Sequence, residues 1–164
     1  MSRGRAAVGT VVFLLLAPGV VAGVIPWLLT RWEVDKALWS PLRLVAGVIL
    51  ASSIGVLVHA FARFVVEGIG TPAPVAPTER LVIGGLYRYV RNPMYLAVVG
   101  AIVGQALLLG QLELVGYAAL VAAAFVVFVR WYEEPTLHRQ FGEEYDAYRR
   151  AVPGWRPRRT GYRR

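Results

Sequence analysis

Four long apolar runs constrain the fold of this 164-residue chain more than any other feature. They cover residues 6–29, 41–66, 93–109 and 112–131, and the first is long enough to cross a hydrocarbon core ~30 Å thick as an α-helix. Hydrophobic residues make up 57% of the chain and charged residues 17%, an imbalance that a soluble domain of this size cannot bury. We therefore expect an all-α integral membrane protein, a single domain with about four transmembrane helices.

The segments around these runs have distinct patterns. Residues 67–92 contain Pro72, Pro74 and Pro77 and then polar and aromatic residues, which predicts an irregular connector outside the membrane. Residues 133–164 carry an apolar stripe opposite charged positions, which predicts an amphipathic helical lid, divided at Gly142 and ending in a basic tail. The stripe consists of Leu137, Phe141, Tyr145, Tyr148 and Val152. Pro18-Gly19 is expected to kink the first helix.

The charge distribution predicts the orientation of the chain. Its net charge is +8, and only Arg31, Lys36 and Arg43 among the basic residues fall on the side opposite the connector and the lid. The positive-inside rule then places both termini and the connector in the cytoplasm. Arginines crowd the C-terminus beside aromatic residues, which indicates an anionic membrane surface as partner and argues against nucleic acid. With no cysteine and two distant histidines, we expect no metal site.

The connector and the end of the fourth apolar run carry the candidate binding residues. Gly84-Gly85 allows a close approach of backbone to a ligand, Asn92-Pro93 begins a helix whose free N–H groups attract an anion, and Tyr87 and Tyr95 offer ring faces to a cation. Glu133 and Glu134 suit the amine and hydroxyls of a polar cofactor. The alternative is an ordinary aromatic belt with snorkelling arginines and two headgroup-level carboxylates.

A second candidate group lies on the second helix. His59, Arg63 and Glu67 follow small residues at every fourth position, on one side of the helix. Ionisable residues within a membrane segment are costly and are functional candidates by default. His59 and Glu67 are therefore candidate bases. An equally good interpretation of His59 is a structural residue, packed in the core with its hydrogen bonds satisfied.

Two blocks of this sequence resemble a known family. The first is Leu81-Val82-x-x-Gly85-x-Tyr87 with Arg91-Asn92-Pro93-x-Tyr95, and the second begins at Glu133-Glu134-x-x-Leu137 and extends through Phe141-Gly142, Tyr145 and Tyr148 to Val152-Pro153. They resemble the signatures of the isoprenylcysteine carboxyl methyltransferase family, integral-membrane enzymes that use S-adenosylmethionine and are related to phospholipid N-methyltransferases. The blocks span about half the chain, and the first two helices carry no diagnostic residue.

The resemblance implies roles for individual positions. Glu133 corresponds to the carboxylate that holds the methionine amine of the cofactor, and Asn92 stands where eukaryotic members have a histidine, so this position cannot relay a proton. Val129 replaces an arginine that contacts the substrate, and Arg130, one position along, is a tentative substrate-side substitute. The implied cofactor-binding set is Leu81, Val82, Gly85, Tyr87, Arg91, Asn92, Pro93, Met94, Tyr95, Glu133 and Glu134.

The sequence thus predicts S-adenosylmethionine-dependent methyl transfer, with S-adenosylhomocysteine as product, to a lipophilic acceptor in the membrane. The acceptor is expected to be isoprenoid-, lipid- or prenylcysteine-like and to react at the cytoplasmic face. Alternatives are a phospholipid amine N-methyltransferase, a sterol-type reductase using NADPH, and a membrane scaffold without activity. The Ala-, Val-, Arg- and Gly-heavy composition indicates a bacterial inner membrane.

Overall fold

The computed structural model describes residues 3–35, 39–68 and 80–162, and the regular secondary structure among them is helical, with no strand. Part of the predicted connector, residues 69–79, lies outside the described residues. The α-helices are α1 (Arg3–Leu16), α2 (Ile25–Thr30), α3 (Ser40–Arg63), α4 (Pro93–Leu109), α5 (Leu112–Phe128), α6 (Glu134–Phe141) and α7 (Glu143–Ala151). Short π- and 3₁₀-helical segments are η1 (Val20–Val24), η2 (Phe64–Gly68), η3 (Gly85–Arg88) and η4 (Val129–Glu133).

Within the described residues, three helical stretches are long and apolar enough to cross a membrane: Val11–Thr30, Ser40–Arg63 and Leu112–Phe141. The fourth apolar helix, α4, is shorter at 17 residues. Prolines at the first turns of α3 and α4 suit positions whose N–H has no helical partner, and Gly110 ends α4 with φ of 65°. The predicted all-α integral membrane fold is confirmed.

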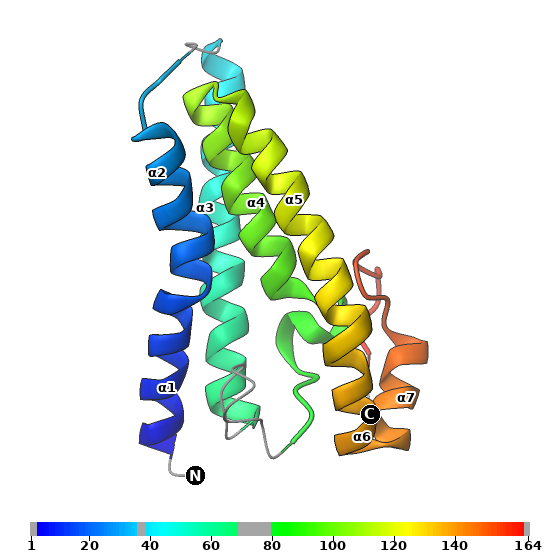
Figure 1. Cartoon of the computed structure of the whole chain (residues 1–164). Helices are drawn as coiled ribbons and strands as arrows, with labels where there is room; N and C mark the ends of the chain where they lie inside the picture. The colour runs from blue at the N-terminus through cyan, green and yellow to red at the C-terminus, as the bar shows by residue number, and fades with distance from the viewer. Residues whose placement is uncertain (1–2, 36–38, 69–79, 163–164) are drawn as a thin grey trace.

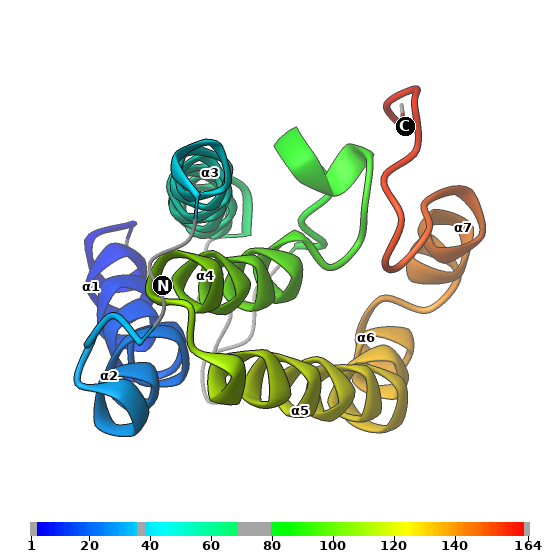
Figure 2. The same ribbon diagram turned by 90° about the horizontal axis from the view of Figure 1, so that it is seen from above.

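Helix α4 lies at the centre of the bundle, between α3 and α5 (Figure 2). Its glycines face α3 closely: a Cβ atom on Gly104 would lie 3.0 Å from the backbone nitrogen of Leu50, and one on Gly100 would lie 2.5 Å from the Ser53 hydroxyl. On the opposite side, a buried apolar cluster joins α4 to α5 and includes Ile102 and Leu114. The small residues on this face of α4 thus let the backbones of α3 and α4 approach each other.

The first apolar run is not one regular α-helix: α1 ends at Leu16, just before Pro18-Gly19, and the π-helical turn η1 that follows is tied to the bundle. In η1 the N–H of Ile25 donates to Val20, so the carbonyl of Val21 loses its helical partner and accepts a 2.8 Å hydrogen bond from the Tyr117 hydroxyl. Pro26 has no N–H for the carbonyl of Ala22, which accepts from Gln105 Nε2 at 2.7 Å instead. Two polar side chains of α4 and α5 therefore satisfy the carbonyls that the irregular turn releases.

The fourth apolar run and the predicted lid, residues 112–131 and 133–164, are joined by continuous helix. The chain passes from α5 through η4 into α6. The N–H of Glu134 donates to Val129, five residues back, and this wider turn carries the chain past Pro135 without a break. Gly142, with φ of 53°, then separates α6 from α7 as predicted. The start of α1, η3, α6 and α7 all lie at the same end of the bundle (Figure 1).

Candidate functional site

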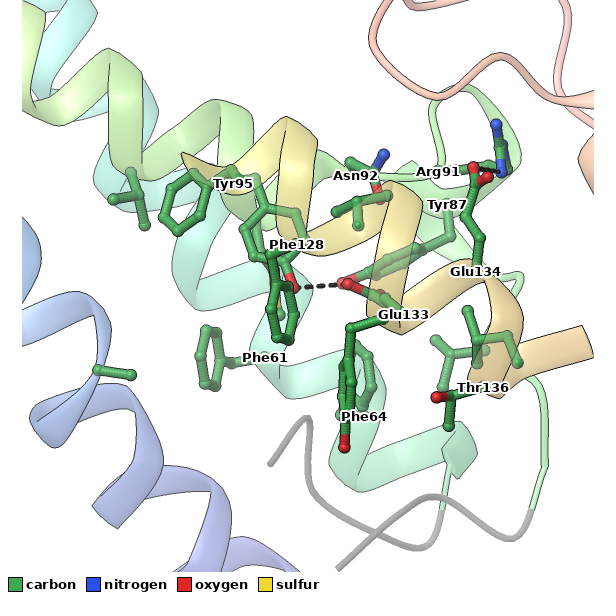
Figure 3. A pocket seen from close by; sticks show the side chains of 18 of the residues that line it. Phe61, Phe64, Tyr87, Arg91, Asn92, Tyr95, Phe128, Glu133, Glu134 and Thr136 are labelled. Atoms are coloured by element: carbon green, nitrogen blue, oxygen red, sulfur yellow. Dashed lines mark hydrogen bonds and ion pairs between the residues drawn. The ribbon is translucent and has the colours of Figure 1, made fainter. Parts of the chain in front are cut away.

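A cavity of about 530 Å³ opens between the helices at this end of the bundle. Its volume falls within the range of cofactor and small-ligand sites, about 300–1,000 Å³. Residues from α1, α3, the connector, α4, α5, η4, α6 and α7 line it (Figure 3). We call the side lined by Arg91, Asn92, Glu133 and Glu134 the polar half of the cavity, and the side lined by residues of α1, η1 and α5, among them Phe13, Val21 and Phe125, the apolar half.

The polar half contains two carboxylates held by different partners. The hydroxyl of Tyr95, in the first turn of α4, donates a 2.6 Å hydrogen bond to Glu133 Oε2. The guanidinium of Arg91 pairs with Glu134 at 2.7 Å and also donates to the Tyr145 hydroxyl at 3.1 Å. Arg149 of α7 contacts the other oxygen of Glu134 at 3.0 Å. Figure 3 shows that Glu133 faces the cavity centre beside Tyr95 and that Glu134 faces Arg91.

Two buried polar atoms of this half have no hydrogen-bond partner among the described residues. They are the hydroxyl of Tyr87 and Nδ2 of Asn92, and both side chains line the cavity. Burial, together with the nearby Glu133 charge, raises the pKa of Tyr87 well above its ordinary value, so the hydroxyl keeps its proton. An unpaired buried polar group costs about 1–3 kcal/mol, and native structures contain few of them. Both atoms are therefore candidate partners for a polar ligand.

The connector that carries these atoms is held by the C-terminal segment. The Tyr148 hydroxyl donates to the carbonyl of Tyr87 at 2.7 Å. Backbone N–H groups of Arg91 and Asn92 donate to Pro153 and Gly154 at 3.0 and 3.3 Å, and the tail returns bonds from Arg158 and Tyr162 to Tyr89 and Arg88, at 2.9 Å each. The predicted stripe Leu137, Phe141, Tyr145, Tyr148 and Val152 packs around Leu81. The backbone pairing of the tail was not predicted, since it follows no side-chain pattern.

Most residues in the predicted cofactor set lie in the cavity wall: Leu81, Val82, Tyr87, Arg91, Asn92, Met94, Tyr95, Glu133 and Glu134. Pro93 is buried as the first residue of α4. Gly85 instead faces α3, since a Cβ atom there would lie 2.5 Å from Nε2 of His59. Sequence reasoning missed the aromatic wall formed by Phe13, Phe61, Phe64, Phe125 and Phe128, although the spacing of Phe125, Phe128 and Tyr132 along one helix face was a usable signal.

The structure does not bring the three tentative catalytic residues to the cavity. Arg130 is exposed on the outside of η4, and His59 lies against the glycine pair of the connector. Glu67 forms an ion pair with Arg63 and accepts a 2.9 Å hydrogen bond from the backbone N–H of Gly84. A Cβ atom on Gly84 would overlap both of these side chains. The end of α3 thus holds the turn that positions Tyr87.

Comparison with known proteins identifies the relatives of the chain. A family model described as phospholipid methyltransferase matches residues 42–144, more than half of the chain. No curated protein and no solved structure matches the chain. The matched region contains the connector, α4, α5 and both carboxylates, whereas α1, α2 and most of α7 lie outside it. The predicted relationship to membrane methyltransferases is confirmed: this chain belongs to the phospholipid methyltransferase family.

Proposed function

We propose that this membrane methyltransferase transfers a methyl group from S-adenosylmethionine to a lipophilic acceptor in the bilayer, at the cytoplasmic face. The observation that carries the proposal is the division of one cavity into two chemically different halves. One half has two carboxylates, an arginine and two unpaired buried polar atoms, and the other has only apolar and aromatic side chains. A reaction between a polar cofactor and an apolar acceptor needs both environments side by side.

The polar half fits the cofactor. Glu133 accepts one hydrogen bond from Tyr95, and a carboxylate has about four lone-pair sites, so it keeps capacity for the amine of a methionine group. The Tyr87 hydroxyl and Asn92 Nδ2 offer partners to carboxylate or hydroxyl oxygens. The rings of Tyr95 and Phe125 lie with their centroids 4.6 Å apart and suit a positively charged sulfur.

The residues of the cavity promote the transfer by position and by exclusion of water. When bound, S-adenosylmethionine supplies an electrophilic methyl group. Glu133 and Asn92 orient its polar end, the apolar half aligns the acceptor, and an in-line displacement requires no covalent bond to the protein. Buried side chains of α7, Tyr145 and Tyr148, cover the polar half and keep water from it.

The acceptor half points to a molecule that enters from the bilayer. We favour an acceptor of isoprenoid, lipid or prenylcysteine-like type, whose reactive atom meets the cofactor near Tyr95. A phospholipid amine is the second candidate, because the matching family model is described as phospholipid methyltransferase. A carboxylate acceptor would need no base, whereas a protonated amine acceptor would first have to lose its proton.

The cytoplasmic orientation rests on charge and aromatic residues. Trp131 is exposed beside the cavity end, and Trp32 and Trp39 are exposed near the other end, as expected of aromatic belts at two interfaces. The cavity end holds the basic residues of the connector and the C-terminal segment. The positive-inside rule therefore supports a cytoplasmic entrance for the cofactor.

The direct test is a calorimetric titration of the purified, membrane-reconstituted protein with S-adenosylhomocysteine. We expect saturable binding that Glu133→Ala weakens at least tenfold, since the carboxylate would bind a charged amine. Glu113→Ala removes an exposed carboxylate near the other end of α5 and should leave the binding unchanged. An absence of saturable binding to the parent protein contradicts the proposal.

A further inference from the structure

The apolar half of the cavity has one wall that the family match does not include. Phe13, Ala17, Pro18 and Val21 of the first membrane span line it and lie before residue 42, where the match begins. The opposite wall, Ala124, Phe125 and Phe128 of α5, lies within the match. One wall therefore belongs to the shared family core, and the other is contributed by a helix outside it.

The two walls are linked to each other at one end of the apolar half and separate at the other. At the end of this wall far from the polar half, the carbonyl of Val21 accepts a hydrogen bond from the hydroxyl of Tyr117 on α5. Toward the polar half, α1 and α5 diverge (Figure 1), and the ring of Phe13 faces that of Phe61 on α3 with centroids 6.2 Å apart. The apolar half is thus a slot, closed at Val21 and continuous with the polar half at its other end.

The dimensions of this slot suit an extended apolar chain. At 1.5 Å per residue, the wall from Phe13 to Val21 runs for about 12 Å along the helix axis. Ala17 lies between these two positions on the same helix face, so its small side chain leaves the middle of the slot open. Leu15 points away from the slot and is 65% exposed.

We propose that α1 and η1 form the specificity-determining wall of this enzyme. Ala17 admits the apolar chain of the acceptor to the closed end of the slot, and Val21 limits the chain length that can enter. The proposal deepens the proposed function and rests on it, because the chain belongs to the molecule whose reactive atom is methylated.

The test uses photoreactive n-alkyl alcohols with octyl, dodecyl and hexadecyl chains and a diazirine at the chain end. The full-length protein is reconstituted in phosphatidylcholine nanodiscs, irradiated with each probe, and the labelled residues are identified by peptide mass spectrometry. We expect labelling at Val21 and Phe125 to exceed labelling at Leu15. Ala17→Phe should reduce labelling at Val21 by about tenfold for the longer probes and spare Phe13 with the octyl probe, because a bulky ring obstructs the slot.

Leu15→Phe places the same ring on the exposed face of α1 and should change nothing. Equal labelling of Leu15 and Val21, or equal effects of the two substitutions, overturns the proposal. Titration with S-adenosylhomocysteine separates this failure from that of the proposed function. Binding of S-adenosylhomocysteine with unselective labelling rejects the slot alone, and selective labelling without such binding rejects the cofactor assignment while the slot stands.

Discussion

The hydroxyl of Tyr95 donates a 2.6 Å hydrogen bond to Glu133, and this bond joins the first turn of α4 to the end of η4 across the cavity. Asn92 and Pro93 begin α4 just before Tyr95, and the wide turn of η4 directs Glu133 inward. The carboxylate is therefore held in place before any ligand arrives, which reduces the entropy lost on binding.

Removal of this hydroxyl should weaken cofactor binding more than it weakens the fold. A hydrogen bond to a charged group contributes about 1.5–3 kcal/mol, so Tyr95→Phe is expected to reduce affinity for S-adenosylhomocysteine by about 10- to 100-fold in calorimetry. Tyr89→Phe is the matched control, since Tyr89 is 38% exposed and does not line the cavity. Equal affinities of the two variants would show that the Tyr95–Glu133 bond does not shape the site.

Glu67 offers a test between positioning and proton transfer. Its Oε2 accepts the N–H of Gly84, and the amide oxygen of Gln can accept the same bond. If Glu67 positions the connector, Glu67→Gln should keep methyl transfer within about threefold of the parent, and Glu67→Ala should reduce it by about tenfold with a lowered Tm, since one hydrogen bond is worth about 1 kcal/mol.

Methyl transfer is measured with radiolabelled S-adenosylmethionine on a membrane lipid extract. If Glu67 is instead the base expected from the sequence, the Glu67→Gln and Glu67→Ala variants should be equally inactive, and both should keep the Tm of the parent protein. That pattern would restore the proton-transfer assignment.

Gly85 should resist substitution for a backbone reason. Its φ of 57° is left-handed, which costs an L-residue about 1–2 kcal/mol, and a Cβ atom would also approach His59. We expect Gly85→Ala to lower the Tm measured by thermal unfolding in detergent. Gly116→Ala, where a Cβ atom meets nothing within 4 Å, should leave the Tm unchanged or slightly higher. A parallel rise for both variants would contradict the close packing of α3 on the connector.

The Tyr117 hydroxyl should stabilise the first membrane span. Tyr117→Phe leaves the ring and removes the partner of the Val21 carbonyl, and hydrogen bonds between membrane helices contribute about 0.6 kcal/mol, up to ~1.7. We expect a small loss in the free energy of unfolding and faster proteolysis of the segment between α2 and α3. Tyr132→Phe, which removes the hydroxyl of a half-exposed side chain on the same helical stretch, should show neither effect.

Several structural elements of this protein can be predicted from short-range patterns in the sequence. Apolar runs determine the helices, Pro41 and Pro93 mark helix starts, and Gly110 and Gly142 mark ends, because each depends on local hydrogen bonding and backbone sterics. Most members of the predicted cofactor set also line one cavity. Their grouping was recognised through a resemblance between motifs, since residues 81 and 133 are too far apart for spacing to relate them.

The sequence by itself determined an all-helical membrane protein with its polar chemistry gathered in the connector and at Glu133 and Glu134. Only the tertiary structure decided that Tyr95 contacts Glu133, that Glu67 faces Gly84 and not the cavity, and that α1 supplies an apolar wall. Contacts between distant segments depend on helix rotation and on local register changes at π turns such as η1 and η4. A single wide turn rotates every later side chain, and no periodicity in the sequence records it.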